Sequence, residues 1–188
     1  MEWTLPSMDE LDSAEATLDV LQRVLSGVTT GDLTRPTPCR EFDVAGLTDH
    51  LLNSITLIGS AAGAQFPERD IEASVRDQVL GAAGPVVAAW RRRGVEGTVP
   101  FGPGEAPARM MARILSLEFL VHAWDYAAAT GQTVDVSDDH PQRVLEWARG
   151  IITPDGRVRA GFDDPVEIGD GAPALDRLLA FTGRRPQD

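Results

Sequence analysis

Apolar residues recur every three or four positions along the first two thirds of the chain, which is the period of an amphipathic α-helix. This pattern predicts four long helices, over residues 8–28, 44–58, 70–93 and 108–130. Asp43 is placed to cap the second helix, and Gly131 is placed to end the fourth. Gly81, Gly84 and Pro85 interrupt the third helix, where we expect a kink or break because proline removes an intrahelical hydrogen bond.

The connecting segments are rich in proline and glycine. Residues 33–43 contain two prolines that exclude helix, and residues 94–107 are expected to form a loop with room for a short strand. Beyond residue 131 the pattern weakens, and it predicts a helix capped by Ser137 or Asp138, an irregular acidic stretch over 153–172, a short helix over 173–181 and a frayed end over 184–188. This order of elements implies an all-α fold, a four-helix bundle with additional short C-terminal helices.

Length and charge narrow the class of protein. With 188 residues the chain is long enough to bury one core, so we expect a single domain over 1–188, with the core bundle over about 8–130 and a C-terminal extension over about 131–188. The net charge of -12 argues against nucleic acid or an anionic membrane as a partner. A homodimer is compatible with a bundle of this size.

The single cysteine, Cys39, excludes an internal disulfide and fits a reducing compartment. No apolar run is long enough to span a bilayer, and the first residues lack the basic and apolar regions of a signal peptide. We therefore expect a cytoplasmic protein.

Two of the three histidines occur where a metal ion could use them. Glu118 and His122 stand four residues apart in the fourth predicted helix and share a face, and His50 lies on an apolar face of the second. Two histidines and one carboxylate are typical of an open zinc or non-haem iron site. Short motifs also arise by chance, and a histidine on an apolar face is more often a hydrogen-bonded core residue. The apolar neighbours of Glu118 favour the metal, because an unpaired buried carboxylate is costly.

Asp125 and Cys39 are weaker candidates for a catalytic role. Asp125 follows His122 by three residues and could orient a ligand from the same face, or pair with an arginine at the surface. Cys39 could be a small buried hydrophobe, or a thiol whose pKa is lowered by the nearby helix N-terminus. His140 precedes a proline among acidic residues, and we expect it to be exposed and not a ligand.

Several runs of residues resemble those of one known family. They are Thr37–Val44, Asp49–Leu51, Leu120–Ala127 with Ala129–Gln132 after it, and Ala172–Leu179. Together they are similar to an actinobacterial branch of the DinB/YfiT-like metal-binding superfamily, near mycothiol-dependent maleylpyruvate isomerase. The resemblance implies a DinB-like four-helix bundle with a divalent metal held by His50, Glu118 and His122. Zinc is the expected metal, with nickel and iron as alternatives.

The resemblance also implies a reaction between a small-molecule thiol, with mycothiol as cosubstrate, and an electrophilic substrate. A metal with an open position can convert a thiol into a nucleophilic thiolate. We favour a thiol S-transferase over the isomerase itself, because the isomerase carries a further domain after its bundle and this chain lacks a dense arginine cluster. A non-catalytic metal-binding accessory or sensor domain and a metal-dependent hydrolase remain as alternatives.

Overall fold

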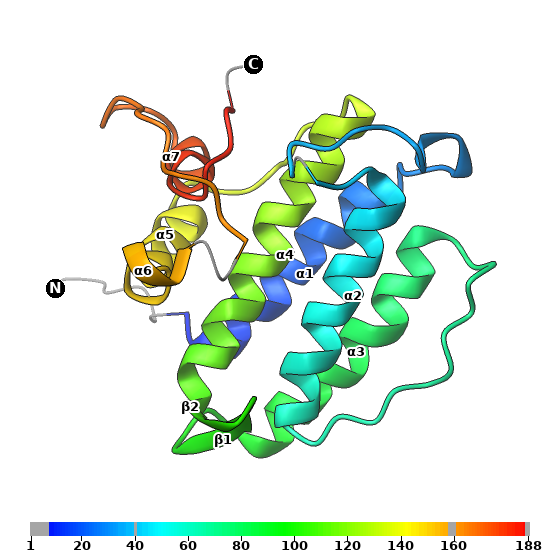
Figure 1. The fold of residues 1–188 in the computed structure, drawn as a ribbon, viewed down its shortest axis with the longest axis vertical. Coiled ribbons are helices and arrows are strands. Elements are labelled where there is room, and N and C mark those ends of the chain that lie inside the picture. The colour runs from blue at the N-terminus through cyan, green and yellow to red at the C-terminus, as the bar shows by residue number, and fades with distance from the viewer. Residues whose placement is uncertain (1–7, 40, 158–160, 187–188) are drawn as a thin grey trace, which may run out of the picture.

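The computed structural model describes residues 8–39, 41–157 and 161–186 (Figure 1). Its elements, in chain order, are α1 (Glu10–Leu25), the 3-10 helix η1 (Thr30–Asp32), α2 (Val44–Ala61), α3 (Val75–Arg93), β1 (Thr98–Phe101), β2 (Gly104–Pro107), α4 (Ala108–Thr130), α5 (Asp139–Ile151), α6 (Pro154–Arg157) and α7 (Ala174–Phe181). The fold is therefore predominantly helical, with one small two-stranded sheet.

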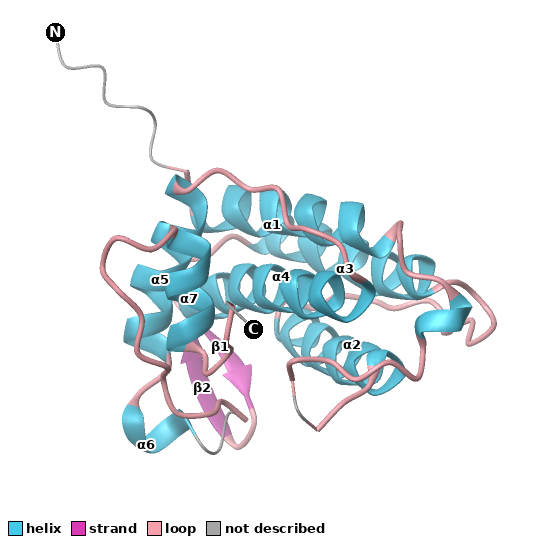
Figure 2. Cartoon of the chain, turned by 90° about the horizontal axis from the view of Figure 1, so that it is seen from above, coloured by secondary structure: helices cyan, strands magenta, loops and turns pink. Residues whose placement is uncertain are grey.

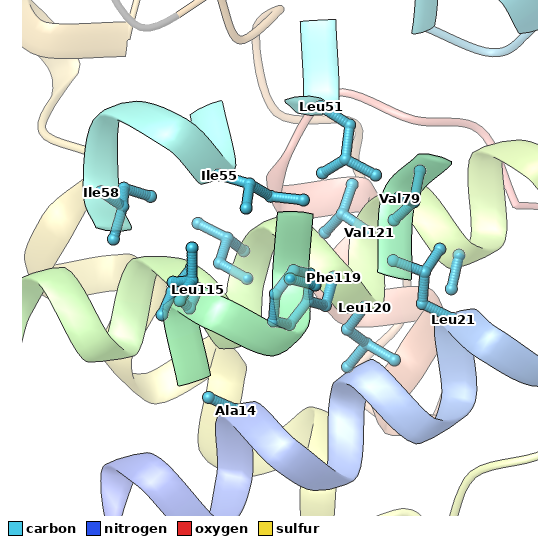
Figure 3. Packing of buried hydrophobic residues seen from close by; sticks show 14 of the residues in the cluster. Ala14, Leu21, Leu51, Ile55, Ile58, Val79, Leu115, Phe119, Leu120 and Val121 are labelled. Atoms are coloured by element: carbon cyan, nitrogen blue, oxygen red, sulfur yellow. The ribbon is translucent and has the colours of Figure 1, made fainter. Parts of the chain in front are cut away.

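The long helix α4 lies at the centre of the molecule. It packs against α1 and α2 on one side and against α5 on the other, while α7 covers α5 (Figures 1 and 2). Helix α3 completes the group of long helices by packing against α1 and α2. The core between them is aliphatic and aromatic, and Figure 3 labels side chains from all four helices, among them Ala14, Leu21, Leu51, Ile55, Ile58, Val79, Leu115, Phe119, Leu120 and Val121.

Local sequence signals fix the ends of the helices that matter most for the site. The carboxylate of Asp43 accepts a hydrogen bond of 2.8 Å from the Gly46 amide, which confirms the predicted cap of α2. Gly131 ends α4 in the left-handed region, at φ 71°, where a residue with a Cβ would be strained. The predicted bounds of α4 are confirmed.

Helix α3 differs from its prediction at two points. It begins at Val75, after a cap by Ser74, rather than at residue 70. It also continues through Pro85, so of the two expected alternatives, a kink or a break, the break is wrong. Proline removes one hydrogen bond and crowds the carbonyl four residues earlier. Buried residues on both sides of Pro85, Val79 and Val86 among them, keep the helix on the core.

The expectation of an all-α fold is also wrong in its strict form. Residues 94–107 hold the antiparallel hairpin of β1 and β2, in which Thr98 pairs with Pro107 and Phe101 with Gly104. Val99 and Ala106 are register partners and are both buried, so the hairpin covers one end of the core. Gly102, at φ 58°, allows the tight turn between the strands.

The C-terminal extension is more ordered than its sequence indicates. The stretch expected to be irregular includes the short helix α6. The sequence predicts a frayed end for Arg184, but only 6% of its surface is exposed. It lies against α4 because it pairs with a buried carboxylate there. Residues 187–188 of that end lie outside the described residues. His140 is buried rather than exposed, and its Nε2 lies 2.8 Å from the Ser13 hydroxyl of α1. None of the helices in the described ranges is long and apolar enough to cross a membrane.

Candidate metal centre

Side chains from α2 and α4 converge where these two helices face each other. His50 of α2 and Glu118 and His122 of α4 each offer one ligand atom, and these atoms all lie within 4.8 Å of one another. They line a cavity of about 630 Å³. The loop before α2 and two stretches of the C-terminal extension, residues 161–164 and 182–184, form its other walls.

A hydrogen bond beside the site sets the spacing of α2 and α4. The hydroxyls of Thr48 and Tyr126 lie 2.9 Å apart, and both side chains are buried. Thr48 is two residues before His50, and Tyr126 is one turn after His122. A buried hydrogen bond at this point holds the two histidines at a defined separation.

His50 is held by two aromatic contacts. Its ring stacks on Phe42, with centroids 5.0 Å apart, and meets the ring of His122 edge-on at 5.3 Å. Phe42 is in place because its carbonyl accepts a hydrogen bond of 2.8 Å from the hydroxyl of Thr37 across the turn before α2. Burial, and then the charge of His122, lowers the pKa of His50, so its neutral, metal-binding form is favoured.

Glu118 has a buried oxygen that the described residues leave without a hydrogen-bond partner. Its Oε2 lies 3.5 Å from His122 Nε2, too far for a good hydrogen bond. Burial alone would raise the pKa of Glu118, but His122, with smaller contributions from His50 and Ser54, outweighs this effect and the pKa is lowered. A charged, buried and unpartnered oxygen is costly, and a cation among the three side chains would remove that cost.

The other ring nitrogen of His122, Nδ1, already has a hydrogen-bond partner. Nδ1 lies 2.9 Å from Oδ2 of Asp125, a carboxylate with no exposed surface. Metal-binding histidines commonly donate this second N–H to a carboxylate, which leaves the remaining nitrogen for the metal. Burial lowers the pKa of His122, but Asp125 and Glu118 outweigh it and raise the pKa to about 9. Asp125 does pair with an arginine, although in the interior rather than at the surface.

That arginine is Arg184, for which the sequence predicts only a frayed end. Its Nη2 lies 2.8 Å from Oδ2 of Asp125, and its Nε lies 3.2 Å from Oδ1. The preceding residue, Gly183, has φ 88° and turns the chain after α7. Gly183 is the local sequence signal for this turn, but it does not predict which residue the arginine contacts.

Cys39 lies in the loop before α2 and lines the same cavity. Burial raises the pKa of its thiol to about 11, and α2 begins five residues later, so no lowering by the helix N-terminus is seen. This outcome favours the packing alternative. Trp124 packs partly on the core and lines a neighbouring cavity of about 610 Å³ with Arg184 and Arg185.

Two imidazoles and a carboxylate without a full set of hydrogen bonds, facing a cavity, suit a divalent cation of the zinc class. The fold and this cluster define a helical protein with a candidate metal centre open on one side. The model of the mycothiol maleylpyruvate isomerase N-terminal domain family matches residues 14–127, and the chain belongs to this family.

Two uncharacterized proteins of Mycobacterium tuberculosis are similar to the chain over nearly its whole length. One is from strain H37Rv and the other from strain CDC 1551, and each is 30% identical over 184 residues, which cover 94% of this chain and 98% of the relative. No solved structure matches the chain. The stretch matched by the family model includes the three clustered residues and Asp125, whereas Arg184 lies beyond it.

Proposed function

We propose that this protein is a divalent-metal-dependent enzyme that uses mycothiol as cosubstrate, as a thiol S-transferase or an isomerase-like enzyme. The observation that carries this proposal is the unpartnered Glu118 oxygen beside two histidines at the wall of a cavity. Membership of a family named for a mycothiol-dependent isomerase supports the choice of thiol. We further propose that the four long helices form the bundle of the DinB/YfiT-like superfamily.

In this proposal His50, Glu118 and His122 hold the metal, which is zinc, with nickel and iron as alternatives. A divalent metal bound there would lower the pKa of a thiol and stabilise its thiolate at neutral pH. Three protein ligands leave a position for such a thiol.

The protein's own residues prepare the site. Asp125 accepts a hydrogen bond from Nδ1 of His122, so that Nε2 faces Glu118, and a metal that binds Nε2 would displace its proton. The buried side chains of α4 around the site exclude water from the back of the cluster. The cavity of about 630 Å³ has room for a thiol and a small electrophile, since small-molecule sites span roughly 300–1,000 Å³.

Metal content tests the binding claim. Untagged protein should contain about one divalent ion per chain, and His122→Ala should lose most of it because two remaining ligands bind far more weakly. His140→Ala is the matched control, since it removes a buried histidine outside the cluster and should keep the metal. Full metal retention in single variants at all three cluster positions would overturn the assignment.

Thiol binding tests the chemical claim. In cobalt-substituted protein, mycothiol should produce a sulfur-to-metal charge-transfer band and support turnover of an electrophile, and Glu118→Ala should abolish both. An accessory domain would give neither effect. A hydrolase would cleave esters or amides at a rate that added thiol does not increase.

A further inference from the structure

Arg184 is one of the few buried cations in the described structure, and it comes from the C-terminal extension. It contacts α4 at Asp125, the residue that holds His122. A row of three side chains, Arg184, Asp125 and His122, therefore runs from the extension to the candidate metal ligand.

The contact is made in a way that fixes orientation. Two nitrogens of the guanidinium, Nε and Nη2, meet the two oxygens of the Asp125 carboxylate, and Nη1 donates to the carbonyl of Thr182 at 3.2 Å. Such a two-point pair holds the plane of the carboxylate, which a single point charge would leave free to rotate. Oδ2 of Asp125 thereby stays on the side of the His122 ring.

The extension is held to the bundle without Arg184, because α5 packs against α4 and α7 packs against α5. A second buried arginine, Arg157, already ties the extension together by donating from Nη1 to the carbonyls of Asp163 and Phe181, each at 2.8 Å. Its guanidinium also lies 4.9 Å from the centroid of the Phe181 ring. These contacts of Arg157 do not involve Asp125, so the two arginines can be separated by experiment.

We propose that Arg184 is a positioning residue of the metal site: it fixes the Asp125 carboxylate, which keeps the proton on Nδ1 of His122 and so presents Nε2 to the metal. This inference rests on the proposed function. It means that the extension, outside the stretch that the family model matches, completes a site whose ligands all come from the helices.

Metal affinity in a pair of variants provides the first test, measured with Zn²⁺ or Co²⁺ against a competing chelator. Arg184→Met should weaken binding roughly 10- to 100-fold, the usual cost of losing an outer partner of a metal ligand. Arg184→Lys keeps the charge but not the two-point contact, so its loss should be smaller. Arg157→Met is the matched control and should stay within about threefold of wild type while its melting temperature falls. Equal losses in the two methionine variants would overturn the proposal, because a loosened extension would then explain both.

A double-mutant cycle provides the second test. If Arg184 acts through Asp125, Arg184→Met should cost little further affinity in an Asp125→Asn background. Additive losses would overturn the proposal. If Arg184→Met does not fold, Arg184→Lys carries the same cycle.

The exchangeable Nδ1 proton of His122 provides a readout besides affinity. In cobalt-loaded wild type it should appear as a shifted, slowly exchanging NMR resonance, which should broaden or vanish in Arg184→Met and persist in Arg157→Met. A persistent resonance with unchanged affinity in Arg184→Met overturns this inference alone, whereas a wild-type protein that binds no metal overturns the proposed function with it.

Discussion

Helix α4 contributes to two clusters, each built around a glutamate that is largely shielded from solvent, and they differ in how completely that glutamate is paired. At its N-terminal end, Arg109 and Arg113 meet Glu10 of α1, a group that we call the closed cluster. Both oxygens of Glu10 accept hydrogen bonds from Arg109, and Oε1 also accepts two from Arg113. In the open cluster of His50, Glu118 and His122, one glutamate oxygen has no hydrogen-bond partner among the described residues.

The difference separates an ion pair that is complete within the protein from a cluster that has an acceptor atom left for a ligand. Burial would raise the pKa of either carboxyl, and in both cases basic neighbours outweigh burial and lower it. Two arginines neutralise Glu10, and each of its oxygens accepts a hydrogen bond from them. Glu118 instead faces a histidine and a cavity. A buried charge alone therefore does not indicate a site, whereas a buried charge with an unused acceptor beside a cavity makes the open cluster a candidate site.

Exchanging each glutamate for glutamine should affect different properties: metal affinity for Glu118 and stability for Glu10. The larger effect is expected for Glu118. Glu118→Gln should weaken metal binding by more than about 100-fold, since losing a direct ligand costs more than losing its outer partner. The melting temperature of the metal-free variant should fall only slightly, because the substitution removes an ion pair with His122 whose atoms lie 3.5 Å apart, too far for a good hydrogen bond. Competition against a chelator and thermal unfolding measure the two effects. If the variant keeps wild-type metal affinity, Glu118 is not a metal ligand.

Cys39 tests whether the open cluster activates a thiol of the protein itself. With a pKa of about 11, Cys39 should react with iodoacetamide near neutral pH on the order of 100-fold more slowly than a free cysteine, whose pKa is about 8.5. The rate should still be rising above pH 9, as mass spectrometry of timed samples would show. Cys39→Ser should bind metal like wild type. Fast alkylation at neutral pH would instead give the thiol a chemical role.

The sequence predicts those features of the open cluster that depend on a single helix. The four-residue spacing of Glu118 and His122 puts them on one face of α4, and the cap at Asp43 sets the phase of His50 on α2. The observed proximity of all three depends on the packing of α2 against α4, which the resemblance to a known family indicated and periodicity did not. Their role as metal ligands remains a prediction.

The contacts that the sequence missed all join segments far apart in the chain. Arg184 lies 59 residues from Asp125, and His140 lies 127 residues from Ser13. The sequence predicts a frayed end for Arg184, and it predicts exposure for His140, which precedes a proline among acidic residues. Local patterns do not report a partner on another element, so a buried polar pair of this kind becomes visible only in the fold.

The closed cluster should respond to substitution in stability alone. Glu10→Gln takes a charged acceptor from Arg109 and Arg113, and we expect the free energy of unfolding to fall by about 1.5 kcal/mol, the lower end for hydrogen bonds to a charged group because both arginines are partly exposed. Urea unfolding measures this change. Metal affinity should stay at the wild-type value. A loss of affinity would show that the two clusters on α4 are coupled.

The smallest expected effect separates the two buried histidines, whose pKa values shift in opposite directions. His122 of the open cluster is raised to about 9, whereas the pKa of His140 is lowered by burial and then by the charge of Arg143. Because the unfolded chain takes up a proton at His140 before the folded protein does, the stability that neutral His140 contributes is fully present above its unfolded pKa and is lost as the pH falls through the lowered folded pKa.

His140→Gln, which cannot titrate, should therefore cost about 1 kcal/mol near pH 8, where the contact with Ser13 is intact, and less near pH 5. Urea unfolding of wild type and variant at both pH values measures the difference, and the subtraction cancels the carboxylates that titrate in both proteins. Ser13→Ala, which removes the same contact but leaves the histidine, is the companion variant and should show a similar cost near pH 8. A cost that grows towards acid would mean that folded His140 binds its proton more tightly than the unfolded chain, as His122 does, and the contrast between the two histidines would fail.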